Sequence, residues 1–240
     1  MNPSEKIREF YEKKAGEDAQ GSPSFIQRVL NEFLAGLPLR HNDKVLDLGS
    51  GIGNNLNVLT RHFYEIVALD ISEKALKKSA RLHKNSRTKF VKGDILNLPF
   101  TSQSYDVVVC TGTLEHITDL RKGIREIARV LKRKGYGVFT VPNYTNLAGY
   151  YKWFRDRASG RRDWCPWHTH EGGFERFMTP GLLKRSLKDS FTVRETRGVD
   201  YSLSWLFFTP VRRFVGFKTI GKIPFIKRLG MHYCVLAQTK

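Results

Sequence analysis

Cysteine is scarce in this sequence, and its spacing predicts neither a disulfide framework nor a zinc site. The three cysteines, Cys110, Cys165 and Cys234, are scattered and form no Cys-x-x-Cys pair. This pattern is typical of a reducing compartment and favours the cytoplasm. Long apolar runs are also missing. None approaches the ~18 residues of a spanning helix, and residues 1–20 lack the apolar centre of a signal peptide, so we expect neither feature.

Acidic residues are few relative to basic ones. The 240 residues include 41 lysines and arginines against 23 aspartates and glutamates, a formal net charge of +18. Such an excess favours polyanionic surroundings, namely RNA, anionic lipid headgroups or acidic substrates. A solvated basic surface would account for the same excess equally well.

Apolar segments alternate with helical periodicity, which predicts an α/β fold with a parallel, doubly wound sheet. Five segments have the pattern of buried strands: 44–49, 64–70, 88–94, 105–111 and 135–141. The clearest helix between them is expected over 119–134, with Gly135 as its C-cap glycine. Further helices are expected over 3–15, 23–36 and 181–188, and further strands over 191–198 and 232–238.

We therefore expect a single domain over residues 1–240, built around one core. A helical cap over 1–40 precedes the core at 41–142. Two segments, 143–178 and 199–230, interrupt the regular pattern and are predicted to cover the substrate side of the domain.

The stretch VLDLGSGIGNN (45–55) places three glycines at every second position directly after a predicted strand, which marks a nucleotide-type cofactor site. The dinucleotide fingerprint requires its third glycine where Asn54 stands, and no Walker A lysine follows. Asp70 ends the second strand, where a carboxylate can accept hydrogen bonds from a ribose diol. Asp94 ends the third strand, within reach of an adenine amine, and Asp47 precedes the turn, where it could bind a cationic amine or orient the glycines. This set, without a phosphate-binding lysine, suits S-adenosylmethionine (SAM).

From about residue 43 to 141 the chain resembles the class I SAM-dependent methyltransferases, particularly the branch that includes ubiquinone and menaquinone biosynthesis enzymes. The matching pieces are VLDLGSGIGNN, VALDIS, VKGDILNLPF, YDVVVCTGTLEHI and LKRKGYGVFTVPN, in that order. The resemblance implies a Rossmann-like, seven-stranded, mostly parallel sheet with helices on both faces and an antiparallel last strand. Residues 191–198 and 232–238 would then be strands six and seven.

The resemblance also implies SAM as the cofactor and a set of residues that bind it. Asp47, Gly49 and Gly51 would surround the methionine part, Asp70 would hold the ribose, and Thr111 would line the methyl-transfer face. The remaining implied cofactor contacts are Ile71, Asp94 and Ile95.

A general base is needed only if the methyl acceptor must lose a proton, and three histidines are candidates for it. His116 follows the fourth strand in CTGTLEHI, on the side that faces the sulfonium, although a structural role is the alternative. His168 and His170 lie in HTHEGGFERF and could replace it if this segment folds over the cleft. We expect no metal site, because His-x-His there lacks a third spaced ligand.

Residues 201–230 combine six basic side chains with large apolar ones and contain no acid. This composition favours an anionic membrane surface or a lipid-like substrate. RNA is a less favoured partner, because the aromatics outnumber what phosphate contact requires. A lid that packs its aromatics into the domain would account for this composition as well as a membrane or lipid contact does.

The sequence thus predicts a SAM-dependent methyltransferase that acts on a small-molecule or lipid-like acceptor, in the cytoplasm or peripheral to the inner face of the membrane. An RNA methyltransferase and a non-catalytic SAM-binding regulatory protein are the alternatives.

Overall fold

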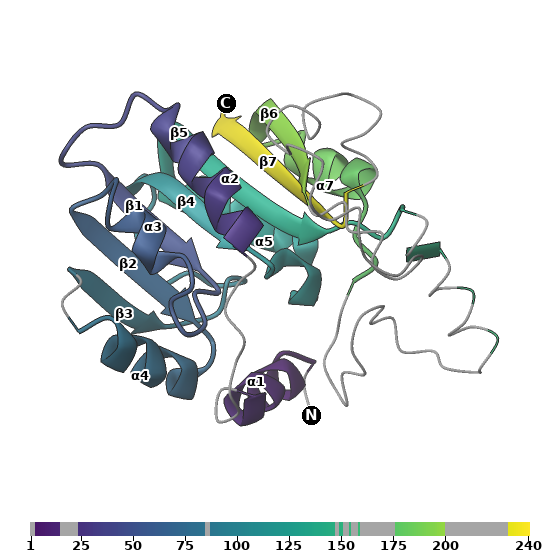
Figure 1. Ribbon diagram of the computed structural model, residues 1–240, viewed down its shortest axis with the longest axis horizontal. Helices are drawn as coiled ribbons and strands as arrows, with labels where there is room; N and C mark the ends of the chain where they lie inside the picture. The colour runs from purple at the N-terminus through teal and green to yellow at the C-terminus, as the bar shows by residue number, and fades with distance from the viewer. Residues whose placement is uncertain are drawn as a thin grey trace, which may run out of the picture.

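Seven strands form one sheet in the order β3-β2-β1-β4-β5-β7-β6 (Figure 1). The computed structural model describes residues 3–14, 24–84, 87–146, 149–150, 154, 158, 176–199 and 230–240. The strands are Lys44–Leu48 (β1), Glu65–Asp70 (β2), Thr88–Lys92 (β3), Tyr105–Thr111 (β4), Leu131–Pro142 (β5), Phe191–Val199 (β6) and His232–Thr239 (β7). Neighbours from β3 to β5 pair in parallel, whereas β7 runs antiparallel to β5 and β6. The predicted fold class is confirmed, including the antiparallel last strand.

Helices cover both faces of the sheet, because alternate residues of each central strand point to opposite sides. The helices are Pro3–Lys14 (α1), Ser24–Ala35 (α2), Leu56–Leu59 (α3), Glu73–Leu82 (α4), Leu120–Val130 (α5) and Pro180–Leu187 (α7). On one face, Leu46 and Val108 share a buried cluster with side chains of α5 and α7. Figure 1 shows α2 and α3 in front of the other face of the sheet, where Val45 and Val107 belong to a buried cluster with side chains of both helices.

The predicted helix over 119–134 is wrong at its C-terminal end, where β5 begins four residues before Gly135. Helix α5 ends at Val130, and Leu131 is already extended and paired with Tyr105 of β4. Gly135 lies inside the strand, where an added Cβ would come within 3.0 Å of the Asp106 carbonyl oxygen. Pairing with β4 therefore outweighs the helical periodicity of these residues. The sequence alone does not reveal this pairing.

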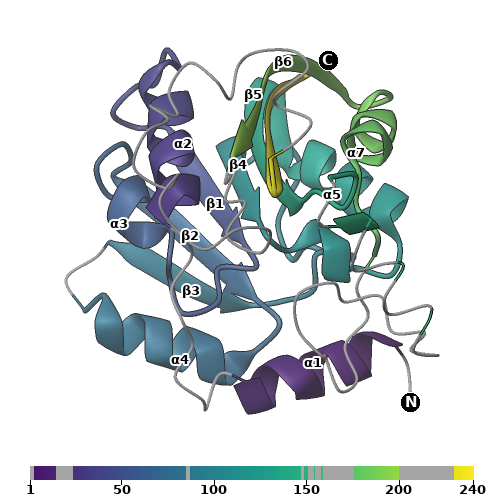
Figure 2. The same cartoon turned by 45° about the vertical axis from the view of Figure 1, so that its right-hand side comes forward.

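The N-terminal helix α1 lies apart from the sheet and beside α4, as Figure 2 shows. Most of segments 143–178 and 199–230, with their predicted substrate-side role, falls outside the described residues. Within the described ranges, no helix has both the length and the apolar character needed to span a membrane.

Candidate active site

A pocket opens at the carboxyl ends of β1 to β4. The strand order reverses at this point, because β2 and β3 lie on one side of β1 whereas β4 and β5 lie on the other. This switch point is where open α/β sheets bind their ligands. The structure brings His116 together there with six of the eight residues predicted to bind the cofactor: Gly49, Gly51, Asp70, Ile71, Asp94 and Ile95. Asp47 and Thr111 do not belong to its wall.

The three glycines of the turn after β1 all adopt positive φ, but they lack side chains for different reasons. A Cβ on Gly49 would lie 2.3 Å from the Thr113 hydroxyl, and one on Gly53 would lie 2.4 Å from the Ser79 hydroxyl. These two glycines therefore permit close packing within the protein. A Cβ on Gly51 would meet nothing within 4 Å, and Gly51 lines the pocket. Gly51 is thus the glycine whose missing side chain leaves space for a ligand.

Asp70, the last residue of β2, is held by the backbone on both of its carboxylate oxygens. Oδ2 accepts from the Gly51 amide at 2.8 Å, and Oδ1 accepts from the Ser72 amide at 2.8 Å. Burial raises the pKa of Asp70 above its ordinary value, against the opposing effect of these amides. Each carboxylate oxygen keeps a further lone pair, so the group can also accept hydrogen bonds from a diol in the pocket. Its predicted contact with ribose remains a prediction.

Asp94 shapes the loop after β3 that forms another wall of the pocket. Its Oδ1 accepts from the Leu96 amide at 2.9 Å, and its backbone carbonyl accepts from the Asn97 amide at 3.0 Å. This turn presents Asp94, Ile95 and Leu96 to the pocket. A carboxylate beside apolar side chains suits a flat base that carries an exocyclic amine.

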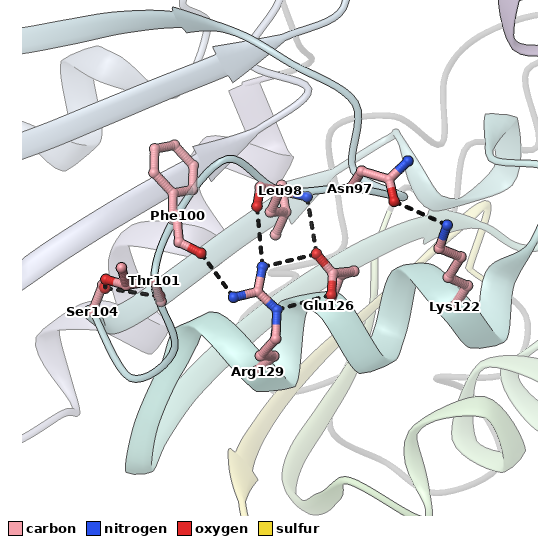
Figure 3. A network of polar contacts seen from close by, with 8 residues as sticks. All are labelled: Asn97, Leu98, Phe100, Thr101, Ser104, Lys122, Glu126 and Arg129. Carbon is pink, nitrogen blue, oxygen red and sulfur yellow. Dashed lines mark hydrogen bonds and ion pairs between the residues drawn. The ribbon is translucent and has the colours of Figure 1, made fainter.

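An ion pair on α5 anchors the continuation of that loop (Figure 3). The Arg129 guanidinium donates to the carbonyls of Phe100 at 2.7 Å and Leu98 at 3.0 Å. Glu126 pairs with Arg129 at 2.9 Å and also accepts from the Leu98 amide at 2.9 Å. The hydrogen bond from Arg129 lowers the pKa of Glu126. The pair thereby fixes the backbone that follows the Asp94 turn, a role that the sequence analysis missed.

Asp47 and Thr111 are linked by Asn55, which directly follows the glycine turn. The Asn55 amide group donates to Asp47 Oδ1 and to the Thr111 hydroxyl, both at 2.9 Å. Asp47 is fully buried, and burial raises its pKa to about 7. Its Oδ2 has no hydrogen-bond partner among the described residues. Asp47 thus holds Asn55, which follows the glycine turn. Both the turn-orienting role of Asp47 and its contact with the methionine part stay predictions.

Another part of the pocket wall is apolar and aromatic. The 3-10 turn Leu114–His116 places His116 there, and α1 adds Ile7 and Tyr11, which are four residues apart and so share one helix face. The Tyr11 and His116 rings meet edge to face, with centroids 5.5 Å apart. The sequence analysis predicted the helix but missed Ile7 and Tyr11, because its pattern does not say which face meets the pocket.

Arg176, near the C-terminal end of segment 143–178, is hydrogen-bonded to the backbone on both sides of His116. Its amide donates to the Glu115 carbonyl at 2.7 Å, and its guanidinium donates to the Thr118 carbonyl at 2.8 Å. His116 lines the pocket, whereas His168 and His170 lie outside the described residues. The choice among the three histidines therefore stays a prediction.

The fold and the pocket define a Rossmann-like domain with a ligand pocket at the switch point of its sheet. The described lining contains the titratable side chains of Asp70, Asp94 and His116 but no lysine or arginine. Residues 46–139 match the family model described as "Methyltransferase domain". The chain is 30% identical over 185 residues to a demethylmenaquinone methyltransferase of Thermotoga maritima, covering 72% of this chain and 77% of the relative. It is 24% identical to a ubiquinone biosynthesis O-methyltransferase of Rickettsia bellii, covering 73% and 74%.

A solved S-adenosylmethionine-dependent methyltransferase from Mesorhizobium loti has the same fold, with a TM-score of 0.59 and 16% identity over 86% of this chain and 95% of that chain. The chain belongs to the class I SAM-dependent methyltransferases. SAM is its cofactor, and the pocket fits it: Gly51 leaves open space, Asp70 offers free acceptor capacity, and acids without cations match a sulfonium.

Proposed function

We propose that this methyltransferase transfers the methyl group of SAM to a small or lipid-like acceptor. The single observation that carries the proposal is the 30% identical relative, whose name points to a quinone acceptor and which matches 72% of this chain. The character of the pocket supports it, because Ile7, Tyr11, His116 and Ile117 give its wall an apolar and aromatic part.

SAM, when bound, supplies an electrophilic methyl group on its sulfonium. Asp70 and Asp94 would hold the nucleoside, and Gly51 would admit the rest of the cofactor to the turn. In-line displacement is accelerated chiefly by alignment and proximity, which these contacts and the apolar wall provide. If the acceptor is a hydroxyl, His116 takes its proton, since an imidazole titrates close to neutral pH.

The protein is further proposed to work in the cytoplasm at the inner face of the membrane, with residues 201–230 on the anionic surface. Six positive charges without an acid would attract such a surface, each contributing on the order of 1 kcal/mol before screening. Liposome sedimentation with neutral and anionic lipids tests this, and reversing the charges of Arg212 and Arg213 should reduce binding without changing SAM affinity. Absence of binding to anionic liposomes at low salt would overturn it.

An RNA methyltransferase is the second candidate function, favoured by the net charge of +18. The described surface adds to it: between residues 71 and 92 the only acid is Glu73, against eight lysines and arginines. The affinity for RNA would fall steeply as the salt concentration rises. The affinity for a membrane would fall less, because apolar burial in the interface does not depend on charge.

Labelled SAM offered to quinone precursors, lipid extracts and RNA in parallel tests the acceptor class. We expect label in the quinone or lipid fraction, and its loss with the Asp70→Ala variant as the cofactor-binding control. Label in RNA alone would overturn the proposal and favour an RNA methyltransferase. Tight SAM binding with no label in any fraction would favour a non-catalytic regulatory protein.

A further inference from the structure

Helix α1 contacts both the active-site pocket and α4. Its residues Ile7 and Tyr11 line the pocket beside His116, the end that we assign to the acceptor, and the Tyr11 ring packs against His116. The next residue along the helix, Glu12, reaches the N-terminus of α4. Figure 2 shows the two helices side by side below the sheet. These contacts join α1 both to the pocket and to α4.

Glu12 caps the N-terminus of α4 from outside that helix. Its carboxylate accepts from the Glu73 amide at 2.8 Å and from the Lys74 amide at 3.3 Å. The N-cap residue Ser72 takes the third amide, that of Ala75, at 3.2 Å. The first amides of a helix have no partner within the helix, and the helix dipole favours a negative charge beside them. This is a directional anchor with two hydrogen bonds and a matched charge.

The anchor lies beside the cofactor end of the pocket. Ser72 is the N-cap residue of α4, and its backbone amide also donates to the Asp70 carboxylate. Glu12 therefore binds the same turn that holds Asp70. The negative charge of Glu12 is close enough to Asp70 to raise the pKa of Asp70 further. One helix thus connects the turn at the cofactor end to the aromatic wall at the acceptor end.

We propose that Glu12 is a positioning residue of the methyltransferase, which holds α1 on α4 so that Tyr11 closes the acceptor end of the pocket against His116. The proposal rests on the proposed function only in assigning this end to the acceptor. If so, the position of Tyr11 in the pocket wall depends on the Glu12 carboxylate, which is not itself among the residues that line the pocket.

Two NMR measurements on the intact protein, without any acceptor, test the proposal. In Glu12→Ala, amide hydrogen exchange at Glu73 and Lys74 should become about fivefold faster, the change expected from losing a helix cap. The ring protons of His116 should also shift toward their positions in Tyr11→Ala, because the ring current of Tyr11 is lost in both variants. Glu12→Gln, which keeps one acceptor oxygen but no charge, should give an intermediate result.

Glu9 provides the matched control, because it is an exposed glutamate on the same helix. Glu9→Ala should leave both the exchange rates and the His116 signals as in the unaltered protein. S-adenosylhomocysteine should dissociate about fivefold faster from Glu12→Ala than from Glu9→Ala, since the helix over the pocket is no longer anchored.

Faster exchange in Glu12→Ala with unchanged His116 signals would show that Glu12 caps α4 without positioning Tyr11, and would overturn the proposal. Unchanged exchange would overturn it at the first step. Because neither readout involves methyl transfer, failure of the acceptor assignment would appear only in the labelling experiment, so the two failures are distinguishable.

Discussion

Replacing Asp47 with asparagine should remove a large pH dependence from the stability of the cofactor-free protein. Burial raises the pKa of Asp47 from 3.8 to about 7. Between these values the folded protein keeps its proton on Asp47 while the unfolded chain has lost it, so folding takes up a proton and the free energy of unfolding falls as the pH rises. The stabilisation is complete below pH 3.8 and is lost through pH 7.

The magnitude follows from the size of the shift. One pKa unit corresponds to about 1.4 kcal/mol, so a shift of about three units amounts to about 4 kcal/mol. Asparagine has nearly the same shape, can keep the hydrogen bond from Asn55 through its oxygen, and carries no charge at any of these pH values. The Asp47→Asn protein should therefore be more stable than the unaltered protein at pH 8, and the difference should shrink toward pH 5.

Urea unfolding at pH 5, 6, 7 and 8, without SAM, measures this difference. Asp189→Asn is the matched control, because Asp189 is exposed, and its stability should follow that of the unaltered protein at every pH. If the stability of the Asp47→Asn protein keeps a constant offset from that of the unaltered protein across this range, the buried carboxyl is not the titrating group and the reasoning fails.

Three further substitutions test the pocket itself. Asp70→Ala should weaken SAM binding by about 1.5–3 kcal/mol, because the ribose loses a charged acceptor; equal affinity by calorimetry would remove Asp70 from the site. His116→Ala should lower kcat far more than SAM affinity if the acceptor is a hydroxyl, and unchanged turnover would mean that His168 or His170 is the base or that none is needed. Arg129→Ala should destabilise the fold by about 1–3 kcal/mol, since it leaves the Leu98 and Phe100 carbonyls without their donor, and should also weaken SAM binding. A loss of stability with full SAM affinity would show that the loop does not need this anchor.

The sheet could be predicted from the sequence because its signals are local. Strands buried on both faces contain a nearly continuous apolar run, as in the VVVC of β4, and the positive φ angles of the turn after β1 favour glycine. The positions of Asp70 and Asp94 at the pocket follow equally directly, because the carboxyl ends of parallel strands meet at one edge of the sheet.

Other features were decided by contacts between residues far apart in the chain. The end of α5 was misplaced because Leu131 joins β4, and nothing in the local pattern distinguishes that pairing from one more helical turn. The link from Asp47 through Asn55 to Thr111 joins the ends of β1 and β4, which are far apart in the sequence. The helical pattern does not show that Arg129 binds the loop at Leu98, because this contact joins residues 31 positions apart.

The N-terminal helix separates the two kinds of information most clearly. Its sequence alone determined that residues near 3–15 form a helix, because periodicity and propensity act within one turn of the chain. Which face it turns to the protein was decided by the tertiary structure, through one carboxylate on the first amides of α4 and one ring against His116. A hydrogen bond across 61 residues leaves no trace in the spacing of either partner, so only the folded chain could assign α1 to the active site.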